Sequence, residues 1–131
     1  MNFRHFRPRK RPMPGKMNKL ELSYRQLLEQ RKMAGEIVRY RYEPLKFKLA
    51  PNTFYTPDFM VTFEDRVEIH ETKGFWEEDA RIKIKMAAEL YPEFIFVGVQ
   101  YKKKQWTYEY FSQIGEACHK EEHEITGLNN Y

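Results

Sequence analysis

The stretch of sequence that decides the fold is FYTPDFMVTFEDRVEIHETK, residues 54–73. Two runs rich in β-branched and aromatic side chains flank a short polar segment, a pattern that predicts two strands joined by a hairpin turn. We place the centre of this turn between Glu64 and Asp65. In the register that follows, Asp58 lies directly opposite Glu71, with their Cβ atoms roughly 5 Å apart.

The same register brings a basic side chain to the two acids. Side chains alternate between the faces of a strand, so Lys73 projects from the same face as Glu71. His70 points to the other face, where we expect it to pack or to meet water. Two carboxylates and one ammonium group, from Asp58, Glu71 and Lys73, are therefore predicted to converge.

This cluster suits a divalent cation. Like charges placed opposite one another destabilise a sheet unless they are compensated. Mg²⁺ binds hard oxygen ligands, commonly one or two carboxylates together with waters and substrate phosphates. The alternative is a network of surface charges on an exposed hairpin face, and the spacing alone leaves both interpretations open.

A helix is predicted before the hairpin. Asn18 is a good N-cap, Glu21 has the spacing of a capping box, and Gly35 ends the apolar pattern. The apolar side chains at helical spacing are Leu20, Tyr24, Leu27 and Leu28. Glu21 falls at the edge of their arc, so it can complete the capping box, reach toward the hairpin, or do both in part.

A second helix is predicted over residues 80–91, after an acidic start and before Pro92. Its apolar arc contains Lys83. A lysine on a buried face is costly unless its amine reaches water or a negative partner, so Lys83 either contacts the active site or a phosphate, or extends its amine to solvent. Arg81 is expected to face solvent or the DNA backbone.

The remaining segments are read as strands and turns. The hairpin strands span residues 54–63 and 67–72, and the strand-like pattern of residues 36–49 is broken at Pro44. Residues 94–100 predict another strand. The lysines 102–104 and the aromatic residues that follow them indicate either a turn into one more strand or a nucleic-acid contact, and we favour the turn.

Composition bounds the class of protein. With 131 residues, 41% of them hydrophobic, the chain suits one globular domain, and we expect no membrane span because no long apolar run is present. Cys118 is the only cysteine, which excludes an internal disulfide bond and favours an intracellular, cytoplasmic location.

Basic charge is concentrated at the N-terminus. Residues 1–19 carry seven basic and no acidic side chains. Because the whole chain has a net charge of +4, the remaining residues have a net charge of −3. We interpret residues 1–17 as a flexible arm that binds DNA phosphates, the alternative being a solubilising or localising tail. The side chains expected to contact DNA there are Arg4, Arg7, Arg9, Lys10 and Arg11.

Pro57-Asp58 followed, thirteen residues after the aspartate, by Glu71-Thr72-Lys73 resembles the signature of the PD-(D/E)XK nuclease superfamily. The longer strings YTPDF, from Tyr55, and ETKGFW, from Glu71, resemble those of small phage-encoded endodeoxyribonucleases. They are also similar to the endonuclease subunit of certain transposases and, more distantly, to Holliday-junction resolvases. The resemblance covers residues 18–100.

The resemblance implies an α/β fold with a restriction-endonuclease-like αβββαβ core, a mixed central sheet flanked by helices. From the length of the chain we expect this core to belong to a single domain of residues 18–131. The resemblance also implies an endodeoxyribonuclease that depends on Mg²⁺ or Mn²⁺. Its substrate would be DNA, possible structures being a junction or a flap. A symmetric substrate would favour a homodimer. The implied metal ligands are Asp58, Glu71, the carbonyl of Thr72 and, as an accessory acid, Glu21, while Lys73 is the implied catalytic lysine. The phage resemblance places the protein in the bacterial host cytoplasm. Two alternatives remain: a transposase-type end-cleaving subunit that needs a partner protein, and a non-catalytic nucleic-acid-binding protein that keeps the fold.

Overall fold

The computed structural model describes residues 16–112, and these form two helices and seven strands. In chain order they are α1 (Lys19–Met33), β1 (Arg39–Tyr42), β2 (Phe47–Ala50), β3 (Thr53–Tyr55), β4 (Phe59–Thr62), β5 (Val67–Lys73), α2 (Glu78–Leu90), β6 (Ile95–Lys102) and β7 (Gln105–Tyr110). The arm residues expected to bind DNA lie outside the described residues: Arg4, Arg7, Arg9, Lys10 and Arg11. No helix between residues 16 and 112 has the length and apolar character needed to cross a membrane.

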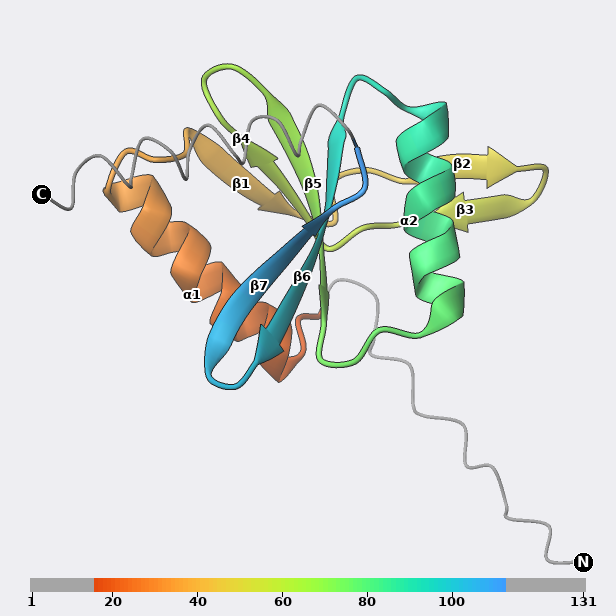
Figure 1. Ribbon diagram of the computed structural model, residues 1–131. Coiled ribbons are helices and arrows are strands. Elements are labelled where there is room, and N and C mark those ends of the chain that lie inside the picture. Colours follow the sequence, from red (N-terminus) through yellow and green to blue (C-terminus); the bar gives the residue numbers. More distant parts are fainter. Residues whose placement is uncertain (1–15, 113–131) are drawn as a thin grey trace, which may run out of the picture.

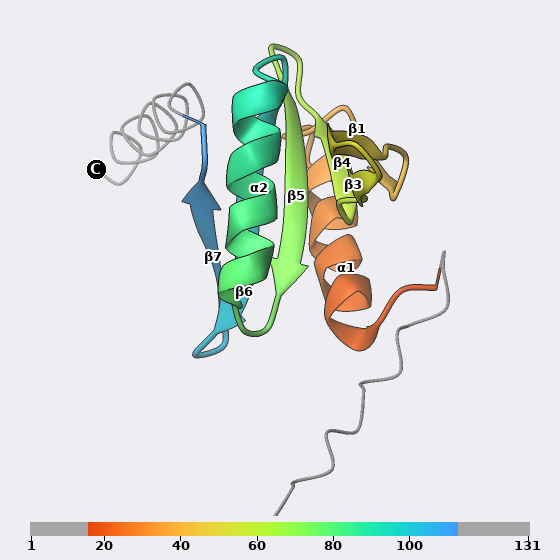
Figure 2. The ribbon, with the colours of Figure 1, turned by 90° about the vertical axis from the view of Figure 1, so that its right-hand side faces the viewer.

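A mixed five-stranded sheet is the centre of the fold. Its strand order is β1-β4-β5-β6-β7, and only β5 and β6 run parallel to each other. Helices α1 and α2 lie on opposite sides of this sheet (Figures 1 and 2). The prediction of an α/β fold with a mixed sheet flanked by helices is confirmed at this level. Strand β7 extends the sheet beyond residue 100, where the resemblance gave no expectation.

The predicted register of the hairpin is confirmed. Strands β4 and β5 pair antiparallel, with Phe59 opposite His70 and Thr62 opposite Val67, so the turn is centred between Glu64 and Asp65. The amide of Phe63 donates a 2.9 Å hydrogen bond to the carbonyl of Arg66 and closes the turn.

Arg66 explains how this turn forms without the glycine or asparagine that tight hairpins favour. Its guanidinium lies 3.9 Å from the ring centroid of Phe63 and pairs with Asp65 at 2.8 Å and with Glu68 at 2.7 Å. These contacts hold the two strand ends together from one side chain.

The prediction of one strand over residues 54–63 was wrong. The chain instead forms β3, leaves the extended ladder at Thr56-Pro57-Asp58, and resumes as β4. Pro57 has no amide hydrogen to donate to a ladder, which favours a break there. Strand β3 pairs with β2 in a separate two-stranded sheet that projects beside α2 (Figure 1).

Each helix covers its face of the sheet with a few large side chains. On the α1 side, Tyr24 and Leu28 are fully buried against residues of β4 and β6. On the α2 side, Ile84 and Ala87 pack against β5 and β6. In α2 only Ile84 and Ala87 are buried, and Leu90 near its end is half exposed.

The helix boundaries follow the predicted signals. The side chain of Asn18 accepts a 2.8 Å hydrogen bond from the amide of Glu21, and the carboxylate of Glu21 accepts one from the amide of Asn18, which completes the capping box. Gly35 has a φ of +77°, the left-handed conformation that glycine adopts at little cost after a helix. Met17, assigned to the arm from sequence, packs against the core on the α1 side.

Candidate functional site

The predicted site residues meet at one end of the central sheet. Asp58 directly precedes β4, and Glu71 and Lys73 lie at the end of β5. Glu21 lies in the first turn of α1, which begins at the same end (lowest in Figure 1). The turn between β4 and β5 and the break at Pro57 thus place two acids side by side on neighbouring strands.

Hydrogen bonds fix the orientation of both carboxylates. Oδ2 of Asp58 accepts bonds from the amide of Thr72 at 2.8 Å and from its hydroxyl at 2.7 Å. Oε2 of Glu71 accepts bonds from the amide of Asp58 and from the hydroxyl of Tyr55, both at 3.1 Å. Each of the two residues is only 7% exposed, so these bonds are made in a desolvated environment.

Lys73 is the nearest positive charge. Its Nζ lies 3.1 Å from Oε1 of Glu71, and its side chain is 37% exposed. Burial alone would lower the pKa of Lys73, but the charge of Glu71 and the hydrogen bond to it outweigh burial and raise that pKa above its usual value. Lys73 therefore carries its charge at neutral pH and keeps an exposed part that can meet a substrate.

The pair of acids is not balanced by this one lysine. Burial, followed by the charge of Glu71, raises the pKa of Asp58 to about 8. Burial also raises the pKa of Glu71, in spite of Lys73. Without a further positive charge, the pair holds on to protons that ordinary carboxylates would release.

The donor set fits a divalent cation held by two carboxylates. Within residues 16–112, Oδ1 of Asp58 accepts no hydrogen bond, so one hard oxygen atom is available beside Glu71. No three Asp, Glu, His or Cys side chains of the described residues are grouped closely enough to hold a metal ion by themselves. A two-carboxylate site completed by waters and substrate phosphate is the arrangement usual for Mg²⁺.

One carboxylate oxygen of Glu21 already accepts two hydrogen bonds within the fold. Oε2 accepts the capping bond from the amide of Asn18 at 2.8 Å and a bond from the hydroxyl of Tyr42 at 3.0 Å. The capping-box interpretation is therefore confirmed. Glu21 also acts on the cluster electrostatically. Burial and the charge of Glu71 are the main causes that raise the pKa of Asp58, and the charge of Glu21 raises it further. Its role as an accessory acid, like the metal contact of the Thr72 carbonyl, stays a prediction.

A cavity of about 370 Å³ opens beside the cluster, between the end of β5, the loop after β3 and the start of α2. Glu71 and Lys73 line it, and so does Lys83. The expectation that Lys83 lies on a buried face was wrong, since its side chain is exposed. Lys83 nevertheless lines the cavity, and its contact with the active site or with a phosphate stays a prediction.

Arg81 lies apart from the cluster. Its guanidinium binds the carboxylate of Glu109 on β7 through two nitrogens, one of them at 2.7 Å. The guanidinium also lies 5.6 Å from the ring centroid of Phe111. A DNA contact by Arg81 stays a prediction, and such a contact would have to compete with Glu109.

Two tyrosines of the site were missed from the sequence. Tyr55 donates to Glu71, and Tyr42 donates to Glu21. Tyr55 lies in β3 of the two-stranded sheet. The apolar pattern of the sequence does not reveal that this sheet is separate from the central one. Tyr40 and Tyr42 alternate with arginines in β1 and therefore lie on the same face of the strand. This alternation in the sequence could have predicted that the Tyr42 side chain points toward α1.

Comparisons with known proteins add no family assignment. The chain matches no protein-family model, and no curated protein or solved structure is significantly similar to it.

Proposed function

We propose that this protein is a metal-dependent endodeoxyribonuclease that hydrolyses phosphodiester bonds of DNA at Asp58, Glu71 and Lys73. The observation that carries the proposal is the buried pair of carboxylates of Asp58 and Glu71, both with a raised pKa. Glu71 lines a cavity that Lys73 and Lys83 also line. A protein that only binds nucleic acid gains nothing from two desolvated acids at its binding surface, because they repel phosphate.

The cavity wall has mixed charge, and this bears on the role of a cation. Glu77 and Asp79 line the cavity together with Glu71, Lys73 and Lys83. A phosphate can approach such a wall only where the lysines and a bound cation outweigh the acids. The charges of the cavity, like the carboxylate pair, therefore support a requirement for Mg²⁺ or Mn²⁺ in this proposal.

Each residue has a distinct task in this proposal. Asp58, through its free Oδ1, and Glu71 would hold the cation, which when bound supplies Lewis-acid polarisation of a phosphate oxygen. Thr72 fixes the carboxylate of Asp58 through two hydrogen bonds. Lys73 stays protonated, so its ammonium can stabilise negative charge that develops on the phosphate oxygens in the transition state.

Placement of the site within the fold is consistent with this function. The elements α1, β1, β4, β5, α2 and β6 follow the αβββαβ order that the resemblance implies, with β2 and β3 as an inserted hairpin. We propose that they form a restriction-endonuclease-like core and that β7 is an addition at its edge.

The proposal is tested by incubating the purified full chain with labelled linear, flapped and four-way DNA in the presence of Mg²⁺ or of EDTA. We expect cleavage of at least one substrate with Mg²⁺ and none with EDTA. Asp58→Ala should abolish cleavage while DNA binding survives, because phosphate contacts and not metal ligands carry most of the affinity.

Glu89→Gln is the matched control, since Glu89 is an exposed acid on α2 away from the cavity wall. It should cleave like the unaltered protein. Cleavage by Asp58→Ala at the unaltered rate would refute the site. Binding of all three DNAs without any cleavage would instead establish the non-catalytic alternative.

A further inference from the structure

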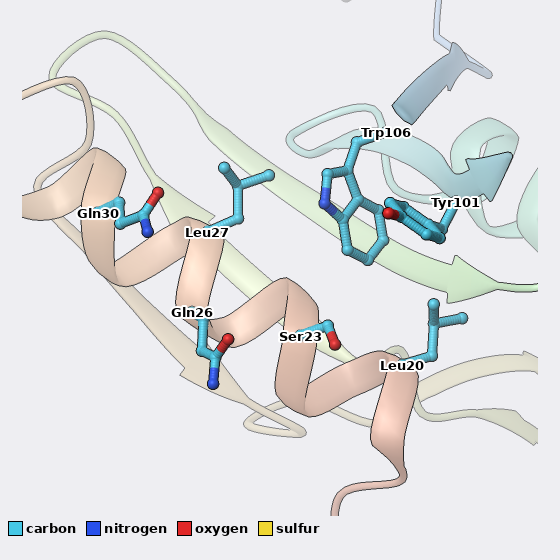
Figure 3. Close-up of a pocket in the computed structure, with 7 residues that line it drawn as sticks. All are labelled: Leu20, Ser23, Gln26, Leu27, Gln30, Tyr101 and Trp106. Carbon is cyan, nitrogen blue, oxygen red and sulfur yellow. The ribbon is translucent and has the colours of Figure 1, made fainter. Parts of the chain in front are cut away.

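A second recess lies on the other side of the sheet end, between α1 and the β6–β7 hairpin. Its volume is about 330 Å³, within the lower range of pockets that take small ligands, ~300–1,000 Å³. Figure 3 shows the side chains of Ser23, Gln26 and Gln30 along α1, with the rings of Tyr101 and Trp106 across from them. We call this recess the aromatic groove, and its lining is completed by Leu20 and Leu27.

The groove presents flat rings and free polar groups. The ring centroids of Tyr101 and Trp106 lie 4.9 Å apart, and Tyr101 is 44% exposed although it is a large aromatic residue. Within residues 16–112, the side chains of Ser23, Gln26 and Gln30 make no hydrogen bond. An exposed tyrosine ring beside a partly buried indole and unused amide and hydroxyl groups suits a planar, polar ligand such as a nucleobase.

The hairpin that carries the two rings is tipped with positive charge. Lys103 and Lys104 form its turn with φ values of +51° and +60°, and together with Lys102 they are exposed. Two-residue turns of this kind favour Asn-Gly, because lysine adopts positive φ only at a cost in free energy. A costly backbone conformation that displays two cations points to a use for those cations. None of the described residues that line the groove is acidic.

The groove begins next to the proposed active site. Leu20 lines the groove and precedes Glu21, while Tyr101 follows Gln100, which pairs with Lys73 across β5 and β6. The amide of Gln100 also donates a 3.2 Å hydrogen bond to the carbonyl of Gly74. The cavity on the α2 side and the groove on the α1 side therefore lie near the same end of the sheet.

We propose that the aromatic groove binds an unpaired nucleotide of the DNA substrate, with the base stacked on Tyr101 and its phosphates held by Lys103 and Lys104. The inference rests on the proposed nuclease function and narrows its substrate to DNA with a single-stranded segment beside the cleavage site. A duplex is too stiff to pass from the cavity around the sheet end into the groove, whereas a single strand can follow that path.

The test compares the affinity of the full chain for a flapped duplex and for a fully paired duplex of equal length, in EDTA. We expect tighter binding of the flapped DNA. Tyr101→Ala should lower that preference by about 5- to 150-fold, the range that stacking of one base on an aromatic side chain supplies. Its affinity for paired DNA should change less than about twofold, and Tyr101→Phe, which keeps the ring, should retain the preference.

The lysines are tested by the double variant Lys103→Asn/Lys104→Gly. An Asn-Gly turn fits the positive φ values better, so this variant should melt at a higher temperature than the unaltered protein. It should nevertheless bind flapped DNA more weakly, with a salt slope lower by about 2.

Equal affinity of the unaltered protein for flapped and paired DNA, or an unchanged preference in Tyr101→Ala, would overturn the inference. Because binding is measured without a divalent cation, a failure to cleave any DNA would refute the nuclease proposal and leave this comparison intact.

Discussion

Lys73 and a bound cation would compete for the same oxygen atom, Oε1 of Glu71, which lies 3.1 Å from Nζ of Lys73. Lys73→Gln removes the ammonium that competes. We therefore expect this variant to bind Mn²⁺ at least as tightly as the unaltered protein, while its cleavage rate falls by about 10²-fold or more. Calorimetric titration with Mn²⁺ and single-turnover cleavage measure the two quantities separately. Weaker Mn²⁺ binding would mean that Lys73 holds the carboxylates in place and is not chemically active.

Asp58 predicts how the stability of the metal-free protein depends on pH. Its pKa is raised to about 8, so between its ordinary value and pH 8 the folded chain keeps a proton that the unfolded chain releases. The free energy of unfolding should therefore fall as the pH rises through this window. Asp58→Asn cannot ionise, and we expect it to unfold with a free energy higher by about 1–3 kcal/mol at pH 8.

Urea unfolding in EDTA at pH 5 and pH 8 measures this difference. The gain from Asp58→Asn should be smaller at pH 5, where the native carboxyl is already protonated. A variant that is less stable than the unaltered protein at pH 8 would show that the carboxylate is adequately balanced in the absence of a metal.

Strand β6 supports the site through close packing at Gly98, which pairs with Glu71 across β5 and β6. A Cβ atom at Gly98 would lie 2.7 Å from Cζ2 of Trp76. Gly98→Ala should therefore displace the indole and lower the free energy of unfolding by about 1–3 kcal/mol. Gly74→Ala is the matched control, because a Cβ there meets no atom within 4 Å. Equal stabilities of the two variants, with unchanged tryptophan fluorescence, would contradict this account of β6.

The hairpin β4–β5 and its register could be predicted from the sequence. One face of the hairpin is buried, and a shift of the register by one residue would turn every side chain to the wrong face. Sequence reasoning placed Asp58 and Glu71 together for the same reason. It missed the sheet formed by β2 and β3, because an apolar run at residues 54–63 does not reveal that Pro57 separates two sheets. Tyr55 was therefore overlooked as a partner of Glu71.

The buried polar side chains between α1 and β5 also escape sequence analysis. Glu68, His70 and Tyr24 form a hydrogen-bonded chain in which Nε2 of His70 lies 2.9 Å from Oε1 of Glu68. Burial alone would raise the pKa of Glu68, but the bonds and charges of His70 and Arg66 outweigh it and lower that pKa. Alternation places His70 away from Glu71, as predicted, yet only the position of α1 supplies its second partner, Tyr24.

At the scale of the whole molecule, positive charge divides between the N-terminal residues and the body. Residues 4–11 carry five basic side chains, and we expect them to neutralise DNA phosphates and to release condensed counterions. Deleting residues 1–15 should weaken DNA binding uniformly across sequences. If about three of these side chains contact duplex phosphates, the log–log salt slope should fall by about 2–3. Mn²⁺ affinity and the cleavage rate at saturating DNA should stay unchanged. Filter binding over a salt series measures the slope, and an unaltered slope would assign DNA binding to Lys83 and to lysines 102–104.

The most direct test of the central claim is the single-turnover rate of DNA cleavage with Mg²⁺ for Asp58→Asn, Glu71→Gln and the double variant. Because the two carboxylates would act as one unit, each single variant should lose about 10³-fold or more, and the double variant little beyond that. DNA affinity should stay within about threefold of the unaltered protein, since the metal ligands contribute little of it. Cleavage by either single variant within about tenfold of the unaltered rate, or losses that multiply in the double variant, would contradict a cation site shared by Asp58 and Glu71.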